Sequence, residues 1–198
     1  MSRLNLWIFA ATIVLAGVSV STARAEDHAS EPRAHAGRDA VWTIDGRVGI
    51  AESWTTGVSH LGFGEGLAVG HTWASRLHLE LQGLRFQGQE VSARNAALSY
   101  RAEYASTQLQ AGFGYELALG PLRVRPELQS GLSFVDGHTT VGTAKLRDEI
   151  TRWMVGPSVA LLVHVSRFVV GVDAQAFFVP TTVAAPSLGC FGVFGIEL

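Results

Sequence analysis

The sequence predicts an all-β fold, an eight-stranded antiparallel up-and-down transmembrane β-barrel. Three observations predict it. From Val41 onward, apolar and polar residues alternate with period two, which is typical of strands with two different faces. The connections between these segments alternate between short and long. Charged residues make up only 16% of the chain against a usual value of about 25%, which suits strands that meet lipid on one face.

The first 25 residues are predicted to be a secretory signal peptide. Arg3 supplies positive charge, residues 4–20 are mostly apolar, and Ala23 and Ala25 are the small residues that a signal peptidase recognises. An uncleaved anchor is the alternative, but the apolar run is marginal for a membrane-spanning helix. Residues 26–40 are polar and are predicted to be a flexible periplasmic leader. The predicted organisation is therefore 1–25 signal peptide, 26–40 leader and 41–198 barrel.

Eight segments carry the alternating pattern, and the clearest is 107–119. There the apolar residues fall on one face and the glutamines and glycines fall on the other. Pro126 is a flaw in the next segment, because proline removes a ladder hydrogen-bond donor. The eight predicted strands are 42–50, 63–69, 77–86, 107–119, 122–134, 151–163, 168–178 and 190–198.

Two positions break the alternation in the first half of the chain. Glu65 falls on the apolar face of its segment, which predicts a bulge or a position at the rim. The phase also slips at Gly83, so that Leu84 and Phe86 are expected to continue the outward apolar face, with a bulge at the glycine.

The lengths of the connections predict which end of the barrel is which. The short turns are 73–75, 120–121 and 166–167, and the longer loops are 53–61, 88–106, 136–150 and 179–187. Outer-membrane barrels have short periplasmic turns and long external loops. This assigns Val41 and Leu198 to the periplasmic side. A helix or a ninth strand at Asn95–Tyr104 remains an alternative to a loop.

The polar face of the strands is predicted to point into the barrel. It combines glycines with charges of both signs, which suits an internal ion-pair network better than a water-exposed surface. A narrow conductance through rearrangement of these charges is the alternative. The predicted lumen network consists of Asp45, Arg47, Glu80, Arg85, Glu116, Arg123, Arg125, Glu127, Arg152 and Asp173.

Aromatic residues near the strand ends predict two girdles at the lipid interfaces. Ordinary core aromatics are the alternative interpretation. The periplasmic girdle is predicted to contain Trp42, Trp73 and Phe168, and the outer one Phe86, Phe134, Trp153 and Phe178, together with Phe63.

With these features, residues 41–198 resemble the eight-stranded outer-membrane barrels of the OmpA transmembrane-domain and OmpX type. The last strand is similar to the assembly signal of that family, with Cys190, Gly192, Phe194, Ile196 and Leu198 at alternate positions. The family usually ends in Phe or Trp, so Leu198 departs from it. The resemblance implies the Gram-negative outer membrane as location, and outer-membrane lipid and the barrel-assembly machinery as partners.

No catalytic residue, cofactor or nucleic-acid partner is predicted. Lipid A deacylases resemble the chain only in the pair His164 and Ser166, which lies at a predicted periplasmic turn with no carboxylate where that pattern requires one. No metal site is predicted except one alternative. Cleavage after Ala25 would expose Glu26-Asp27-His28, and an amine followed by a third-position His can bind Cu(II) or Ni(II).

The sequence therefore predicts a non-enzymatic outer-membrane protein with a structural or surface-interaction role. Contacts would be made by its external loops, of which 92–106 is the longest candidate, and the loop partner is unknown. A narrow transport barrel and a lipid-modifying enzyme are the alternative functions.

Overall fold

The computed structural model describes residues 40–53, 61–94, 99–180 and 186–198. The predicted signal peptide, the leader up to residue 39 and the predicted His28 site lie outside these residues. None of the described residues forms a helix that could cross a membrane.

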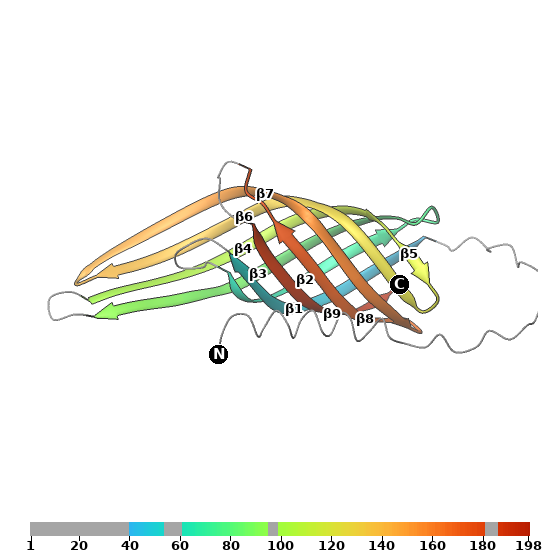
Figure 1. The fold of residues 1–198 in the computed structure, drawn as a ribbon, viewed down its shortest axis with the longest axis horizontal. Helices are drawn as coiled ribbons and strands as arrows, with labels where there is room; N and C mark the ends of the chain where they lie inside the picture. Colours follow the sequence, from blue (N-terminus) through green and yellow to red (C-terminus); the bar gives the residue numbers. More distant parts are fainter. Residues whose placement is uncertain (1–39, 54–60, 95–98, 181–185) are drawn as a thin grey trace, which may run out of the picture. The chain divides into compact units, whose positions relative to one another are not determined.

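The described chain forms a single antiparallel sheet that closes on itself (Figure 1). Each strand pairs with the next one in sequence, except that β4 pairs with β6 and not with β5, and β1 pairs with β9. The strands are β1 (Val41–Ser53), β2 (Gly62–Thr72), β3 (Leu77–Arg94), β4 (Ser99–Tyr115), β5 (Leu117–Leu119), β6 (Leu122–Val141), β7 (Ala144–Val165), β8 (Phe168–Phe177) and β9 (Ser187–Glu197).

The short strand β5 continues β4, so the barrel has eight strands. Both pair with β6 in one register, since Gly114 lies opposite Glu127 and Leu117 opposite Val124. The ladder is interrupted beside Pro126, which has no N–H to donate. The Glu116 N–H instead donates to the Arg76 carbonyl, 2.8 Å away. The eight-stranded, all-antiparallel barrel expected from the sequence is confirmed.

The stagger of the strands sets the width of the barrel. Paired residues can be followed from Phe134 through Arg85, Val48 and Val172 once around the sheet. They return to β6 at Val124, ten residues from the start. A closed sheet of eight tilted strands leaves an interior that side chains can fill.

Three tight turns lie at one end of the barrel, which we call the turn end. They connect β2 to β3, β5 to β6 and β7 to β8. Their tightness shows in positive φ angles at Arg76 (68°), Gly120 (66°) and Ser166 (59°). The Leu198 N–H donates to the Trp42 carbonyl, so the first and last strands meet at this same end. The predicted short turns are confirmed.

The opposite end, the hairpin end, differs from the prediction. The segments 88–106 and 136–150 were expected to be loops, but most of these residues extend the strands of the β3–β4 and β6–β7 hairpins (Figure 1). The second hairpin turns at Gly142, whose φ is 60°. Of the ambiguous segment Asn95–Tyr104, residues 99–104 are strand, and 95–98 lie outside the described residues. Strands without one consistently apolar face are hard to distinguish from loops by periodicity.

Most apolar side chains of the barrel point outward, and most polar side chains of its middle part point inward. Leu67 is 67% exposed and Leu81 is 61% exposed, whereas Glu80 and Asp173 are buried. A soluble barrel would have the opposite arrangement. The closed sheet therefore presents an apolar face to its surroundings.

The predicted phase slip at Gly83 is wrong. The β2–β3 pairing runs without a shift from Gly62 to Thr72, and the only irregularity between β3 and β4 falls between Gln87 and Glu90. Alternation therefore continues through Gly83, which turns Leu84 and Phe86 inward and Arg85 outward. Glu65 faces outward without a bulge.

The outward charges Glu65 and Arg85 are direct cross-strand neighbours. Opposite charges in this position stabilise a strand pair. This arrangement accounts for two charged residues on an otherwise apolar face.

Candidate functional site

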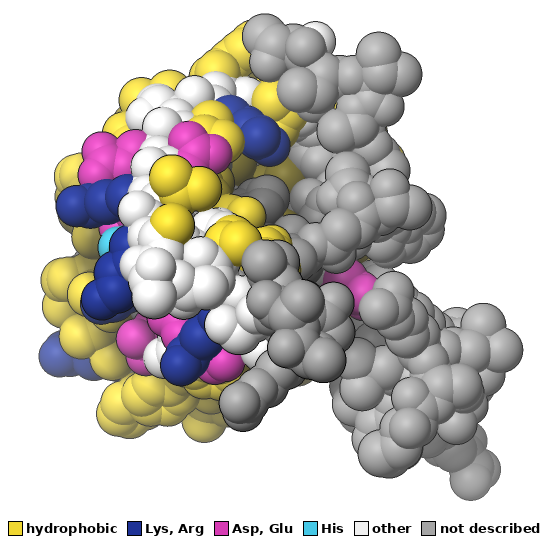
Figure 2. All heavy atoms as spheres, turned by 90° about the vertical axis from the view of Figure 1, so that its left-hand side faces the viewer, with side chains coloured by type: hydrophobic (Ala, Val, Ile, Leu, Met, Phe, Trp, Pro, Cys, Tyr) yellow, Lys and Arg dark blue, Asp and Glu magenta, His cyan; other side chains and the backbone are white. Residues whose placement is uncertain are grey.

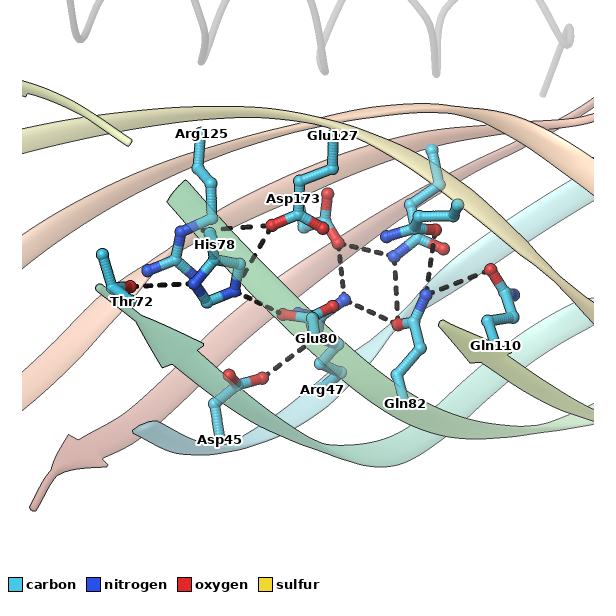
Figure 3. Close-up of polar contacts among 12 residues, drawn as sticks. Asp45, Arg47, Thr72, His78, Glu80, Gln82, Gln110, Arg125, Glu127 and Asp173 are labelled. Atoms are coloured by element: carbon cyan, nitrogen blue, oxygen red, sulfur yellow. Dashed lines mark hydrogen bonds and ion pairs between the residues drawn. The ribbon is translucent and has the colours of Figure 1, made fainter. Parts of the chain in front are cut away.

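The lumen contains a buried arginine surrounded by carboxylates from three strands (Figure 3). The Arg47 Nε donates to Asp45 Oδ1 at 3.0 Å, and Nη1 donates to Asp173 Oδ2 at 2.8 Å. The Arg47 Nη2 donates to Glu80 Oε2. Inward-pointing positions on β1, β3 and β8 bring these residues together. Arg47 therefore links opposite walls of the barrel.

A second arginine organises the side of the cluster nearer the turn end. The Arg125 Nη2 donates to Glu116 Oε2 at 2.9 Å, while Arg125 Nε lies 4.0 Å from Glu127 Oε1. Arg123 Nε lies 3.8 Å from Glu116 Oε1. We call the connected side chains the lumen cluster: Asp45, Arg47, His78, Glu80, Glu116, Arg123, Arg125, Glu127 and Asp173.

His78 is a member of this cluster that the sequence did not indicate. Its Nδ1 hydrogen-bonds with Thr72 Oγ1 at 2.8 Å. Its Nε2 lies 3.6 Å from Glu127 Oε1 and 3.9 Å from Glu80 Oε2, and it has no hydrogen-bond partner among the described residues (Figure 3). The side chain is fully buried. Only the position of His78 on the polar face of β3, two residues before Glu80, could have suggested this site.

Two glycines make room for the cluster. A Cβ at Gly70 would lie 2.6 Å from His78 Cε1, and one at Gly112 would lie 2.8 Å from Glu127 Oε2. These contacts are too close for any other residue unless the side chains move. The glycines on the polar face therefore allow bulky charged groups to share a narrow lumen.

A layer of glutamines continues the network toward the hairpin end. Gln82 Oε1 accepts from Arg47 Nη1 at 2.6 Å and from Gln175 Nε2 at 3.2 Å. Gln82 Nε2 in turn donates to Gln129 at 2.9 Å and to Gln110 at 3.2 Å. Amides can both donate and accept, so they connect the charged cluster to the walls.

Beyond the glutamines, apolar side chains fill the lumen. The Phe86 and Phe191 rings are both fully buried, with centroids 6.0 Å apart in an edge-to-face arrangement. We call this group the apolar plug; it comprises Ala51, Leu61, Leu84, Phe86 and Phe191. The sequence did not indicate the plug, because Leu84 and Phe86 were expected to face outward.

The predicted lumen residues are placed as follows. Eight lie in the lumen cluster: Asp45, Arg47, Glu80, Glu116, Arg123, Arg125, Glu127 and Asp173. Arg152 is half-buried opposite Ser133, and no described ion pair joins it to the cluster. Arg85 was assigned to the lumen wrongly, since its strand keeps phase and the side chain is exposed on the outer face.

The predicted girdle residues lie on the outer face, with one exception. Those near the turn end are Trp42, Trp73 and Phe168, and those toward the hairpin end are Phe134, Trp153 and Phe178. Trp153 Nε1 donates to Ser130 Oγ at 2.9 Å, which satisfies the indole on an apolar face. The assignment of Phe86 to the outer girdle is wrong, because its side chain is 0% exposed within the plug.

The outer face of the two long hairpins is polar. Arg101 Nε lies 3.0 Å from Glu90 Oε1 on β3, and Arg147 Nη2 lies 3.1 Å from Asp136 Oδ2 on β6. Asp136 and Glu149 raise the pKa of Arg147 through ion pairing. Figure 2, which looks onto this end, shows Lys and Arg side chains next to Asp and Glu side chains.

A groove of about 590 Å³ lies across this polar surface. We call it the hairpin groove; it is lined by Ser92, Ser99, Tyr100, Arg101, Glu103, His138, Thr140 and Lys145. The predicted contact segment 92–106 contributes to it, together with residues of β6 and β7.

The pair His164 and Ser166 lies at the turn end. His164 Nδ1 is 2.8 Å from Glu197 Oε1, so a carboxylate does lie beside the histidine, from a strand that the sequence pattern did not suggest. Ser166 is in the turn itself. The histidine and the carboxylate bridge the β7 and β9 walls near the mouth of the lumen.

No protein-family model and no curated protein sequence matches the chain. Solved structures do match its fold. A major outer membrane protein from Thermus thermophilus is similar with a TM-score of 0.55 at 12% identity, over 81% of this chain and 100% of that one. The outer membrane protein OprG from Pseudomonas aeruginosa has a TM-score of 0.52 at 9% identity, over 81% of this chain and 96% of that one.

Neisserial surface protein A (NspA) has a TM-score of 0.51 at 12% identity, over 80% of this chain and 96% of that one. At such identities the likeness concerns the fold alone. The closed sheet, the outward apolar face and these matches agree: the chain has the fold of the eight-stranded outer-membrane β-barrels.

Proposed function

We propose that this protein is a non-enzymatic outer-membrane barrel that presents its two long hairpins as a contact surface outside the cell. One observation carries the proposal. The lumen is filled across its width by charged, amide and apolar side chains, whereas the hairpins extend beyond the apolar face and form a polar groove. Functional capacity therefore lies on the hairpins rather than in the lumen.

The membrane location is supported by the outer face. Leucine, valine and aromatic side chains remain exposed on all sides of the barrel. A contiguous exposed apolar surface of this kind marks a membrane or protein interaction site. A closed barrel also leaves no unpaired strand edge in the hydrocarbon region, as spanning a bilayer requires.

A transport function has less support. Passage through the lumen would require rearrangement of the Arg47 ion pairs, the Gln82 hydrogen bonds and the Phe86–Phe191 contact at once. Eight-stranded barrels generally have room only for their own side chains.

The hairpin groove supports a contact role. It combines the cationic side chains Arg101 and Lys145 with Glu103, the Tyr100 ring and hydroxyl groups. Arginine and tyrosine are enriched at interaction surfaces, and mixed charges favour a polar or charged partner. We therefore expect the partner to be a charged molecule on a neighbouring surface.

Cysteine labelling of intact cells tests the membrane topology. In a Cys190→Ser background, Thr143→Cys places a thiol at the β6–β7 turn, and Ser75→Cys is the matched control at the turn end. A membrane-impermeant maleimide should label only the cysteine at 143 in intact cells and both after lysis. Labelling of the cysteine at 75 alone in intact cells, or recovery of the protein in a soluble fraction, would contradict the proposal.

The contact role is tested by changing the groove. Cells that display wild-type protein should attach to polysaccharide-coated or protein-coated surfaces more strongly than cells that display Arg101→Ala/Lys145→Ala. Glu65→Gln is the control, because it changes a charge outside the groove. Equal attachment of all three, at equal surface amounts, would argue against a contact role. Release of acyl chains from lipid A by the wild type would show enzymatic activity and would contradict the proposed non-enzymatic role.

A further inference from the structure

Three side chains of the lumen cluster converge on one point. One ligand atom from each of His78, Glu80 and Glu127 lies within 4.8 Å of the ligand atoms of the other two, and all three side chains are buried (Figure 3). An imidazole and two carboxylates from β3 and β6 form a donor set that suits a divalent transition-metal ion.

The hydrogen bonding of His78 gives a second, independent observation. Nδ1 is engaged by Thr72 Oγ1, which leaves Nε2 as the atom that faces Glu80 and Glu127. In the neutral ring with a proton on Nδ1, the Nε2 lone pair points at two carboxylates, which is unfavourable without a cation between them. A hydrogen bond from the other ring nitrogen is also the usual way in which a metal-binding histidine is held in place.

The distances leave space for an ion. Nε2 is 3.6 Å from Glu127 Oε1 and 3.9 Å from Glu80 Oε2, which is too long for a hydrogen bond. Two ligands held about 2.0–2.1 Å from a tetrahedral zinc ion are roughly 3.4 Å apart. Small side-chain adjustments would thus bring these atoms to zinc.

The second oxygen of Glu80 is also available. Arg47 engages Oε2, but Oε1 is buried with no hydrogen-bond partner in the described part of the chain. A buried carboxylate oxygen without a partner is costly. The site therefore contains two atoms without a hydrogen-bond partner among the described residues, His78 Nε2 and Glu80 Oε1. Both belong to the group of side chains that meets the Glu127 carboxylate.

The net charge of the lumen cluster also favours a bound cation. It contains five carboxyl groups and three guanidinium groups, so with all of them ionised and His78 neutral its net charge is −2. Unbalanced buried charge is strongly unfavourable. One divalent cation would neutralise the cluster, whereas the alternative is the uptake of two protons.

We propose that His78, Glu80 and Glu127 bind one Zn²⁺ ion inside the barrel. Thr72 orients the imidazole, Arg47 orients the Glu80 carboxylate, and Gly70 and Gly112 leave the space in which His78 and Glu127 meet. The ion enters from the turn end, since Thr72 is the last residue of β2 and His78 the second of β3. The apolar plug closes the other side.

Cobalt binding to the folded protein tests the proposal. Purified, detergent-solubilised barrel is titrated with Co²⁺, whose visible absorption distinguishes four-coordinate sites, and then competed with Zn²⁺. Folding is verified by the gel shift between boiled and unboiled samples. All proteins carry His28→Ala and His35→Ala, because histidines of the amino-terminal segment could bind metal independently.

Two variants remove ligands with little change in shape. His78→Asn places an amide near Thr72 but lacks Nε2, and Glu127→Gln replaces one carboxylate oxygen by an NH₂ group. We expect the parent to bind one Co²⁺ that Zn²⁺ displaces, and each variant to bind at least tenfold more weakly. His138→Ala, which removes an exposed histidine of the hairpin groove, should bind like the parent.

Stability provides a second measurement. Zn²⁺ should raise the urea midpoint of the parent, because a ligand that binds only the folded state stabilises it, and should leave that of His78→Asn unchanged. A folded parent that takes up no Co²⁺ or Zn²⁺ would overturn the proposal and indicate neutralisation by protons. Uptake unaltered in both ligand variants would overturn it as well. If His78→Asn fails to fold, Glu127→Gln alone decides between these outcomes.

Discussion

At the scale of single residues, Arg47 joins the carboxylates of the lumen cluster to the glutamine layer. It contacts Asp45, Glu80 and Asp173, and through Gln82 it reaches the glutamine layer. The carboxylates surrounding it come from three strands that are distant in sequence. A buried ion pair stabilises a protein little more than well-packed apolar residues of the same volume would. Removal of one partner, however, leaves an uncompensated buried charge.

We predict that Arg47→Met destabilises the folded barrel by about 3–5 kcal/mol, the range seen when one partner of a buried ion pair is removed. The measurement is urea unfolding in lipid vesicles, with the gel shift as readout. Arg147→Met is the matched control, because its ion pairs lie on the exposed face of a hairpin, and its midpoint should equal that of the wild type. Equal midpoints for all three proteins would show that the cluster is not a source of stability.

The face on which the charged lumen residues lie could be predicted from the sequence, but their partners could not. The inward direction of Arg47, Glu80 and Asp173 follows from period-two alternation, because alternation alone assigns a face. Which carboxylate meets which arginine does not follow, since that depends on strands that are adjacent only after closure. His78 was missed for the same reason: its partners Thr72 and Glu127 are identified by register, not by spacing.

At the scale of elements, a strand in this barrel has up to three zones. In the middle of the barrel the outward residues are apolar. Apolar residues also point inward in two buried clusters, and in the hairpins the outer face is polar. The sequence predicts the first zone well, because one face is uniformly apolar. The prediction fails at Phe86, where an apolar side chain turns inward, and at the hairpins, where the outer face is polar.

We predict that position 67 on β2 does not tolerate charge. Leu67→Arg places a cation on the outward face at a site that is 67% exposed, and should destabilise the membrane-inserted barrel by about 2–4 kcal/mol. Thr140→Arg, on the outward face of the β6 hairpin extension, is the comparison and should change little. The readout is the urea midpoint in lipid vesicles. If both variants unfold at the wild-type midpoint, the outer face does not contact hydrocarbon.

The β6–β7 extension should be separable from the barrel. Replacing residues 138–147 by Asn-Gly joins Gly137 to Asp148, which are already paired, with a favoured hairpin turn. We expect the shortened protein to insert into vesicles and shift on gels like the wild type, because the deleted residues pair with each other and with β4 and belong to neither the lumen cluster nor the apolar plug. Failure to insert would assign the extension a role in folding.

At the scale of the whole molecule, the barrel is a closed sheet with a filled interior. The lumen cluster, the glutamine layer and the apolar plug follow one another along the lumen from the turn end toward the hairpin end. Each uses a different interaction: ion pairs, amide hydrogen bonds and aromatic packing. A solute would have to break all three to cross.

We accordingly predict no steady conductance for the wild-type protein in planar lipid bilayers. A larger, open-pore barrel reconstituted under the same conditions is the positive control for insertion. Reproducible single-channel steps that change in size with Arg47→Met would contradict this and favour the transport alternative.

The seam between β1 and β9 has a consequence for how the protein folds. Ile44 pairs with Ile196, so the first strand of the sheet is completed by the strand that follows all others in sequence. Until it arrives, β1 presents an unpaired edge that can recruit other chains. Contacts between such distant segments slow folding, because the loop must close before they form. A chain in which β9 has not yet paired is therefore prone to aggregate. The whole polypeptide must be kept from aggregating until the β1–β9 seam closes.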